Sequence, residues 1–142
     1  YGFRAVEPEA IYEVDCDIFC PCAIGGILND KTIPKLKCQI VAGCANNQLE
    51  DESRHGPMLH ERGILYAPDY IINAGGVIQV IDEIRGYNPE RARMKTAQIY
   101  GRLLSIFETA KKEGILPLEA ANRYAESRIR EIQKLRRLYV PK

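Results

Sequence analysis

The sequence lacks several features that define whole classes of protein. No apolar run approaches the ~20 residues that a membrane-spanning helix needs, and no basic segment followed by an apolar one begins the chain, as in a secretory signal. We therefore expect a cytoplasmic protein with no membrane partner. The chain also lacks an initiating Met, so we expect a processed or internal piece of a longer protein. Its 142 residues, 46% of them hydrophobic, suffice for an ordinary hydrophobic core.

The five cysteines lack the spacing of a typical metal site. Cys16, Cys20 and Cys22 follow the pattern C-x3-C-x-C, whereas structural zinc sites usually contain C-x2-C, which occurs nowhere in this chain. Their odd number and the missing secretory signal argue against a disulfide framework. We therefore predict buried free thiols on strands and no metal ion. The alternative is a non-catalytic cysteine-rich module that binds a metal or a partner protein.

The charges are divided unevenly along the chain, although the net charge is only +1. Residues 1–88 contain 7 Lys+Arg and 13 Asp+Glu, and residues 89–142 contain 13 and 6. The basic residues of the second part alternate with apolar ones at helical spacing, and aromatic residues are not interleaved for base stacking. This pattern favours a solvated helix surface, and we expect no nucleic-acid partner.

Short apolar segments alternate with helix signals in the first half of the chain. The strand candidates are residues 17–20, 39–43 and 64–67. Residues 7–13 are expected to form a loop or short turn, whereas residues 30–36 and 57–62 are expected to form brief helices, and residues 77–84 form an amphipathic segment. Strands that alternate with helices predict an α/β fold with a parallel sheet.

Two long helices are predicted to follow this sheet. Asn88 is a typical N-cap before Pro89, and Gly114 is a typical end signal. A second helix is expected to begin at Pro117. Apolar residues at three-four spacing predict packing faces on both helices: Ala92, Thr96, Ile99, Leu103, Ile106 and Ala110 on one, and Leu118, Ala121, Ala125, Ile129, Ile132 and Leu135 on the other. We therefore divide the chain into a sheet-containing part, residues 1–87, and a helical part, residues 88–142.

Three loops with unusual residues follow apolar segments. They are residues 21–23, 44–48 and 73–76, and we interpret the last as a strand-to-helix turn. The adjacent Gly75 and Gly76 lack Cβ atoms, so backbone or ligand can approach them closely. Because the carboxyl ends of parallel strands meet at one edge, all three loops are expected at the edge where such sheets bind small molecules.

Several segments in series resemble a known enzyme family. Residues 17–23 (DIFCPCA), 32–34 (TIP), 42–49 (AGCANNQL), 54–56 (RHG) and 66–78 (YAPDYIINAGGVI) are similar, in order and spacing, to the carboxyl-terminal part of the glutamate/leucine/phenylalanine/valine dehydrogenases, above all to the leucine-specific members. The resemblance implies the second half of a Rossmann-like NAD-binding domain followed by two terminal helices. It also implies NAD-dependent, reversible oxidative deamination of leucine or another branched-chain amino acid to its 2-oxo acid.

The resemblance covers only part of such an enzyme. The family's catalytic lysine lies in an amino-terminal domain that nothing here matches, and the glycine-rich pattern G-x-G-x-x-G is also missing. We therefore expect no catalytic residue in this chain, no activity from the chain alone, and a cleft completed by the missing amino-terminal domain. The family also implies a homo-oligomer.

The resemblance assigns cofactor-binding residues one by one. Cys22 and Ala23 resemble the strand-end residues beside the nicotinamide ribose. Asn47 resembles the asparagine that contacts both the nicotinamide and the substrate carboxylate, with Asn46 as its close neighbour. An amide suits this role because it can donate a hydrogen bond to a carboxylate without adding charge.

The resemblance also assigns the substrate pocket. Val77 and Val80 resemble its apolar wall, which is sensible because residues three apart share a helix face. Glutamate-specific relatives have a serine at the position of Ala74, where it binds the distal carboxylate of the substrate, and alanine cannot do so. Cys20 and Cys44 depart from the family pattern, in which alanine and serine are more usual.

Overall fold

The computed structural model describes the backbone of residues 2–138 and the side chains through residue 135. Three strands, β1 (Ile18–Phe19), β2 (Ile40–Val41) and β3 (Leu65–Tyr66), form a parallel sheet in the order β1-β2-β3. Each strand lies inside a predicted segment but is shorter than expected. The parallel α/β arrangement predicted from the sequence is confirmed.

The first hydrophobic core lies between this sheet and the segments that cover it. Phe19, Val41 and Tyr66, one from each strand, are buried together with Leu28 and Leu59. The covering segments are the 3-10 helices η1 (Pro8–Glu13) and η2 (Ile33–Lys35) and the helix α1 (Glu52–Glu61). The short 3-10 helices occupy the places where we expected a turn and a brief helix.

Helix α1 begins earlier than the sequence prediction, which placed it at residues 57–62. The carboxylate of Asp51 accepts hydrogen bonds from the backbone N–H groups of Ser53 at 2.9 Å and Arg54 at 3.3 Å, so Asp51 is the N-cap. Pro57 therefore lies inside the helix, and the predicted start at residue 57 was wrong. The helix ends before Gly63, as expected, and Gly63 has a φ of +71°.

The interpretation of residues 73–76 as a strand-to-helix turn was also wrong. The apolar run before it forms the short helix α2 (Asp69–Ile72), and α3 (Gly75–Ile84) follows, so these residues join two helices. The run becomes helical because Ile71 packs against the buried face of the terminal helices, which a strand in the sheet would not reach. The prediction that the glycine pair opens a helix is confirmed.

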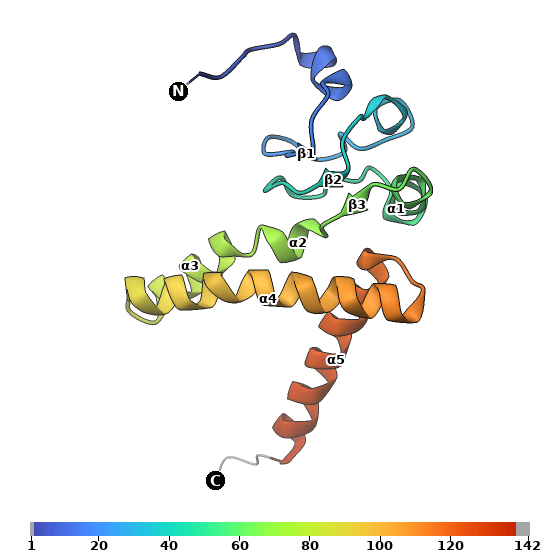
Figure 1. The fold of residues 1–142 in the computed structure, drawn as a ribbon. Helices are drawn as coiled ribbons and strands as arrows, with labels where there is room; N and C mark the ends of the chain where they lie inside the picture. The colour runs from blue at the N-terminus through green and yellow to red at the C-terminus, as the bar shows by residue number, and fades with distance from the viewer. Residues whose placement is uncertain (1, 139–142) are drawn as a thin grey trace.

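The two terminal helices, α4 (Pro89–Glu113) and α5 (Pro117–Leu138), have the predicted start signals. Asn88 Oδ1 accepts a hydrogen bond from Arg91 N at 2.8 Å, and Gly114 ends α4 in a left-handed conformation with a φ of 65°. In Figure 1, α4 lies alongside α2 and α3, and α5 projects away from the sheet. Within the described part of the chain, no helix is both long and apolar enough to cross a membrane.

A second core joins α4 to the start of α5. It contains Ile106, Ala110, Ala120 and Ala121, with Ile71 of α2 packed against it. The predicted face of α5 is thus buried only near its beginning. Farther along, Ile129, Ile132 and Leu135 are 56%, 50% and 66% exposed, so this end of the face is at least half open to solvent.

Candidate functional site

The loops after β1 and β2 lie against each other at the carboxyl edge of the sheet. Ala45 N donates a hydrogen bond to Pro21 O at 2.9 Å, and the thiol of Cys20 donates one to Ala42 O at 2.6 Å. A Cβ atom on Gly43 would lie 2.1 Å from Pro21 O. Glycine is therefore required at position 43, because any side chain would push the two loops apart.

The turn that follows Cys22 and Ala23 is held against the two asparagines. Gly26 N donates a hydrogen bond to Asn47 O at 2.7 Å, and a Cβ on Gly25 would lie 2.7 Å from Asn46 O. Asn47 has a φ of 51°, a left-handed conformation that asparagine tolerates better than most residues. The proposed cofactor-binding residues of both loops, all of them exposed, thus lie along one edge of the sheet.

The third predicted loop reaches the same edge from α2. Asn73 Nδ2 donates a hydrogen bond of 2.5 Å to Asn46 Oδ1. Beside this pair is an open hollow of about 380 Å³, whose lining residues are Cys44, Asn46, Asn73, Gly76, Val77 and Val80. The structure therefore brings together three of the predicted residues, Asn46, Val77 and Val80. Cys22, Ala23, Asn47 and Ala74 are not among those that line the hollow.

Two buried polar residues that sequence reasoning did not select hold this edge in place. The carboxylate of Asp69 accepts hydrogen bonds from Gln48 N at 3.0 Å and from Tyr70 N at 2.6 Å. The side chain of Gln48 is fully buried, and its Nε2 donates to Gly43 O at 2.8 Å and Ala45 O at 3.0 Å. The only sequence signal was the position of Asp69 after Pro68, at the start of a helix where a carboxylate is favoured.

The hollow is lined by amides, one thiol and apolar side chains. It has no carboxylate, ammonium or guanidinium group among its lining residues, so it suits an uncharged or apolar group of a ligand. Outside the hollow, burial raises the pKa of Tyr70 to about 12, with a further contribution from Glu52, so this phenol stays neutral in ordinary buffers. Across the described residues, no group of three Cys, His, Asp or Glu side chains is arranged to hold a metal ion.

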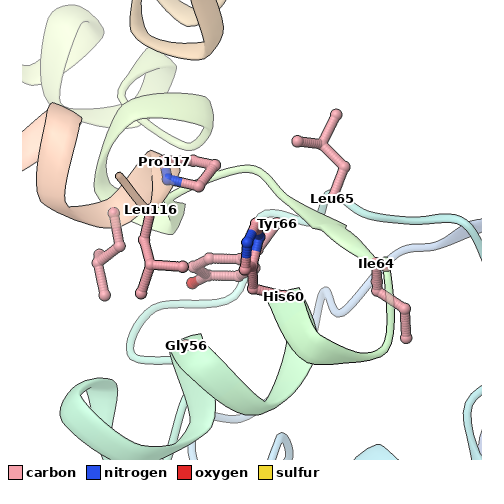
Figure 2. Close-up of a pocket in the computed structure, with 9 residues that line it drawn as sticks. Gly56, His60, Ile64, Leu65, Tyr66, Leu116 and Pro117 are labelled. Carbon is pink, nitrogen blue, oxygen red and sulfur yellow. The ribbon is translucent and has the colours of Figure 1, made fainter. Parts of the chain in front are cut away.

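A second hollow, of about 210 Å³, lies where α1, β3 and the start of α5 meet. Figure 2 shows His60 and Tyr66 facing Leu116 and Pro117 across it. It includes Gly63 and Ile64, which lead into β3, and Leu65, the first residue of that strand, so it extends toward the amino end of the strand, away from the loops described above. Its lining is mainly apolar, and none of the predicted site residues belongs to it.

Comparison with known proteins decides the family. The family model of the glutamate/leucine/phenylalanine/valine dehydrogenases matches residues 2–137. The chain belongs to this family. A leucine dehydrogenase from Thermoactinomyces intermedius is 56% identical over 140 residues, which are 99% of this chain and 38% of that protein. A phenylalanine dehydrogenase from Lysinibacillus sphaericus is 58% identical over 124 residues, 87% of this chain and 32% of the relative.

The structural comparison agrees with the sequence comparison. The crystal structure of L-tryptophan dehydrogenase from Nostoc punctiforme superposes with a TM-score of 0.86 and is 54% identical; the match covers 91% of this chain and 38% of that one. The α/β fold is therefore that of the dehydrogenase family. The chain spans about 38% of the length of the leucine dehydrogenase, so its resemblance is to one part of such an enzyme.

Proposed function

We propose that this chain forms the nicotinamide side of the active-site cleft in an NAD-dependent amino-acid dehydrogenase. The reaction is the reversible oxidative deamination of leucine or another branched-chain amino acid to its 2-oxo acid. The observation that carries the proposal is the hollow at the sheet edge, where Asn46 and Asn73 face the same space as Val77 and Val80. Amides beside an apolar wall suit a nicotinamide carboxamide and an aliphatic side chain.

The donor groups at this edge fit the nicotinamide end of NAD. Asn73 donates to Asn46 Oδ1, and no described residue accepts from Asn46 Nδ2, so that amide can donate to a ligand carbonyl. Cys22 and Ala23 would lie beside the ribose, and Asn47 would donate to the substrate carboxylate. When bound, NAD supplies the acceptor or donor for the hydride of the substrate α-carbon.

The roles of this chain in that reaction are positioning and exclusion of water. Val77 and Val80 provide an apolar surface on α3 that a substrate side chain would cover, which displaces water from the reacting centre. Both valines are more than half exposed in the chain as it stands, so a ligand or another protein part can reach them. The groups that move protons belong, by family resemblance, to the amino-terminal domain.

The residues around the hollow also support a substrate without a distal charge. Ala74, Val77 and Val80 offer no hydrogen bond to a second carboxylate, and the lining has no cationic group. This favours leucine, isoleucine and valine over glutamate. The 58% identity to a phenylalanine dehydrogenase makes an aromatic amino acid the second candidate.

The proposal has a direct test that uses both the complete protein and the 142-residue chain. The complete protein, which includes the amino-terminal domain as its partner, is expected to produce NADH from leucine, as a cytoplasmic homo-oligomer. The isolated chain is expected to produce none and to bind NAD weakly, because the helix amino terminus that holds the pyrophosphate is not part of it. Leucine-dependent NADH formation by the purified chain would refute this division of roles.

A further inference from the structure

Three exposed thiols gather at the proposed nicotinamide edge. Cys20 and Cys22 follow β1, and Cys44 follows β2 and lines the hollow. The prediction that the thiols are buried was wrong for these three, because they lie on loops after the strands and not within the sheet. The two remaining cysteines lie elsewhere, since Cys38 is buried in the first core and Cys16 packs against that core. The chain thus contains an accessible group of thiols and a sheltered pair that serves as an internal comparison.

The thiols of Cys20 and Cys22 are neighbours on the surface of the β1 loop. Both are exposed and only Pro21 separates them in the sequence, and residues two apart on an extended segment face the same side. Cys20 also donates to Ala42 O at 2.6 Å, which holds its sulfur next to the β2 loop. Burial raises the pKa of Cys20, and the nearby Cys22 and Cys44 raise it further, so the Cys20 thiol favours its protonated form.

We propose that Cys20 and Cys22 form a reversible disulfide when a hydroperoxide such as hydrogen peroxide reaches this edge. The thiolate of Cys22 attacks one peroxide oxygen, the O–O bond breaks, and the product is a sulfenic acid with release of hydroxide. The sulfur of Cys20 then attacks the sulfur of Cys22, the S–O bond breaks, and the leaving hydroxide takes up the proton of Cys20. In total, two thiols and one molecule of hydrogen peroxide give one disulfide and two water molecules, and an added dithiol reduces the disulfide back to two thiols while becoming oxidised itself.

The disulfide would change the cofactor side of the cleft, a consequence that rests on the proposed function. Cys20 must give up its hydrogen bond to Ala42 O, and Cys22 must turn toward Cys20 and away from the ribose. Oxidation is therefore expected to reduce turnover until the disulfide is reduced. A bond between residues so close in sequence is strained, which makes it easy to reduce and suits a switch better than a permanent cross-link.

The disulfide itself is tested by peptide mapping of the complete protein in a Cys16→Ser variant. Trypsin then yields residues 5–31, with Cys20 and Cys22 as the only cysteines, and residues 38–54, with Cys38 and Cys44. After peroxide treatment and alkylation under denaturing conditions, the first peptide is expected to lack alkyl groups, to weigh two hydrogen atoms less, and to be alkylated only after reduction. Full alkylation of this peptide, or a cross-link to residues 38–54, would overturn the assigned pair.

The regulatory effect is tested on the same preparations by leucine-dependent NADH formation. Peroxide is expected to lower the activity by roughly tenfold, the loss that about 1.4 kcal/mol of binding interactions would cause, and dithiothreitol is expected to restore it. Cys20→Ala is expected to keep its activity in peroxide, whereas the control Cys16→Ser loses it. A mapped disulfide with unchanged activity would refute the regulatory role. If the complete protein is inactive before oxidation, the proposed function fails while the mapping still decides the disulfide.

Discussion

The amide of Asn73 donates a 2.5 Å hydrogen bond to Oδ1 of Asn46, across the junction between the β2 loop and α2. This bond links two loops that are 27 residues apart in the sequence. It also fixes the orientation of the Asn46 amide, because Oδ1 is held by Asn73 and Nδ2 is left as the donor. Both residues line the hollow that Val77 and Val80 complete. The bond therefore connects the proposed cofactor-binding loop to the segment that leads into the proposed substrate pocket.

Replacing Asn73 should loosen this connection. In the complete enzyme, Asn73→Ala is expected to lower kcat/KM for leucine several-fold, because a neutral hydrogen bond contributes about 0.5–1.5 kcal/mol. The matched control is Asn122→Ala, which removes a similar exposed hydrogen bond, donated by the Tyr70 hydroxyl to Asn122 Oδ1, outside the hollow. Steady-state kinetics would contradict the role of Asn73 if both variants lose the same activity.

Asn47 is expected to contribute more, because its proposed partner is a charged carboxylate. A hydrogen bond to a charged group contributes about 1.5–3 kcal/mol, so Asn47→Ala in the complete enzyme should lower kcat/KM by roughly tenfold or more. Alanine is strained at the φ of 51° that Asn47 adopts, whereas glycine is not. Asn47→Gly therefore removes the same side chain without backbone strain and serves as the control. If either variant retains the full catalytic efficiency, Asn47 does not contact the substrate.

Local signals predicted much of this fold, and contacts between distant segments explain what was missed. Asn88 with Pro89, and Gly114, act within one helical turn, so the bounds of α4 could be read from the sequence. The helical state of residues 70–72 depends on packing of Ile71 against α4 and α5, which no local pattern contains. At the candidate site, the resemblance selected Asn46, Val77 and Val80, which line one hollow and whose roles stay predictions, whereas Asp69 was missed because its partner Gln48 lies 21 residues away.

The junction between α3 and α4 makes acid stability testable. Hydrogen bonds from Arg91 and from Asn88 N to the buried carboxylate of Asp82 hold its pKa below the ordinary value of 3.8. Because the folded state has the lower pKa, this stabilisation is present above the unfolded pKa and is lost as the pH falls through the folded one. Urea unfolding of the purified chain should therefore show decreasing stability below about pH 4.

Asp82→Asn is expected to flatten this acid dependence without abolishing it. The remaining slope comes from Asp51, whose pKa is also lowered. The largest cause is the hydrogen bond that the Ser53 hydroxyl donates to its carboxylate. The exposed Glu61, for which no hydrogen bond or ion pair is found among the described residues, provides a control, and Glu61→Gln should leave the curve unchanged. An acid slope of equal size in Asp82→Asn and in the parent chain would show that Asp82 does not control it.

The exposed face of α5 predicts association. Ile129, Ile132 and Leu135 form an apolar surface that projects from the sheet with the helix (Figure 1), and such surfaces favour self-association or partner binding. Light scattering of the purified chain at micromolar concentration should show an oligomer. Ile129→Lys combined with Ile132→Lys should shift it toward the monomer, whereas Gln133→Lys, which adds one charge nearby, should not. A well-folded monomeric parent chain would contradict this expectation.

The most direct test of the proposed function is the ratio of kcat/KM for leucine and for glutamate, measured with the complete enzyme and NAD. The apolar lining by Val77 and Val80 leaves the distal carboxylate of glutamate without a partner, and burying an unpaired charge costs several kcal/mol. The account predicts that leucine is preferred by about a hundredfold or more. Equal values for the two amino acids, or a preference for glutamate, would contradict the assignment of this hollow as the substrate pocket.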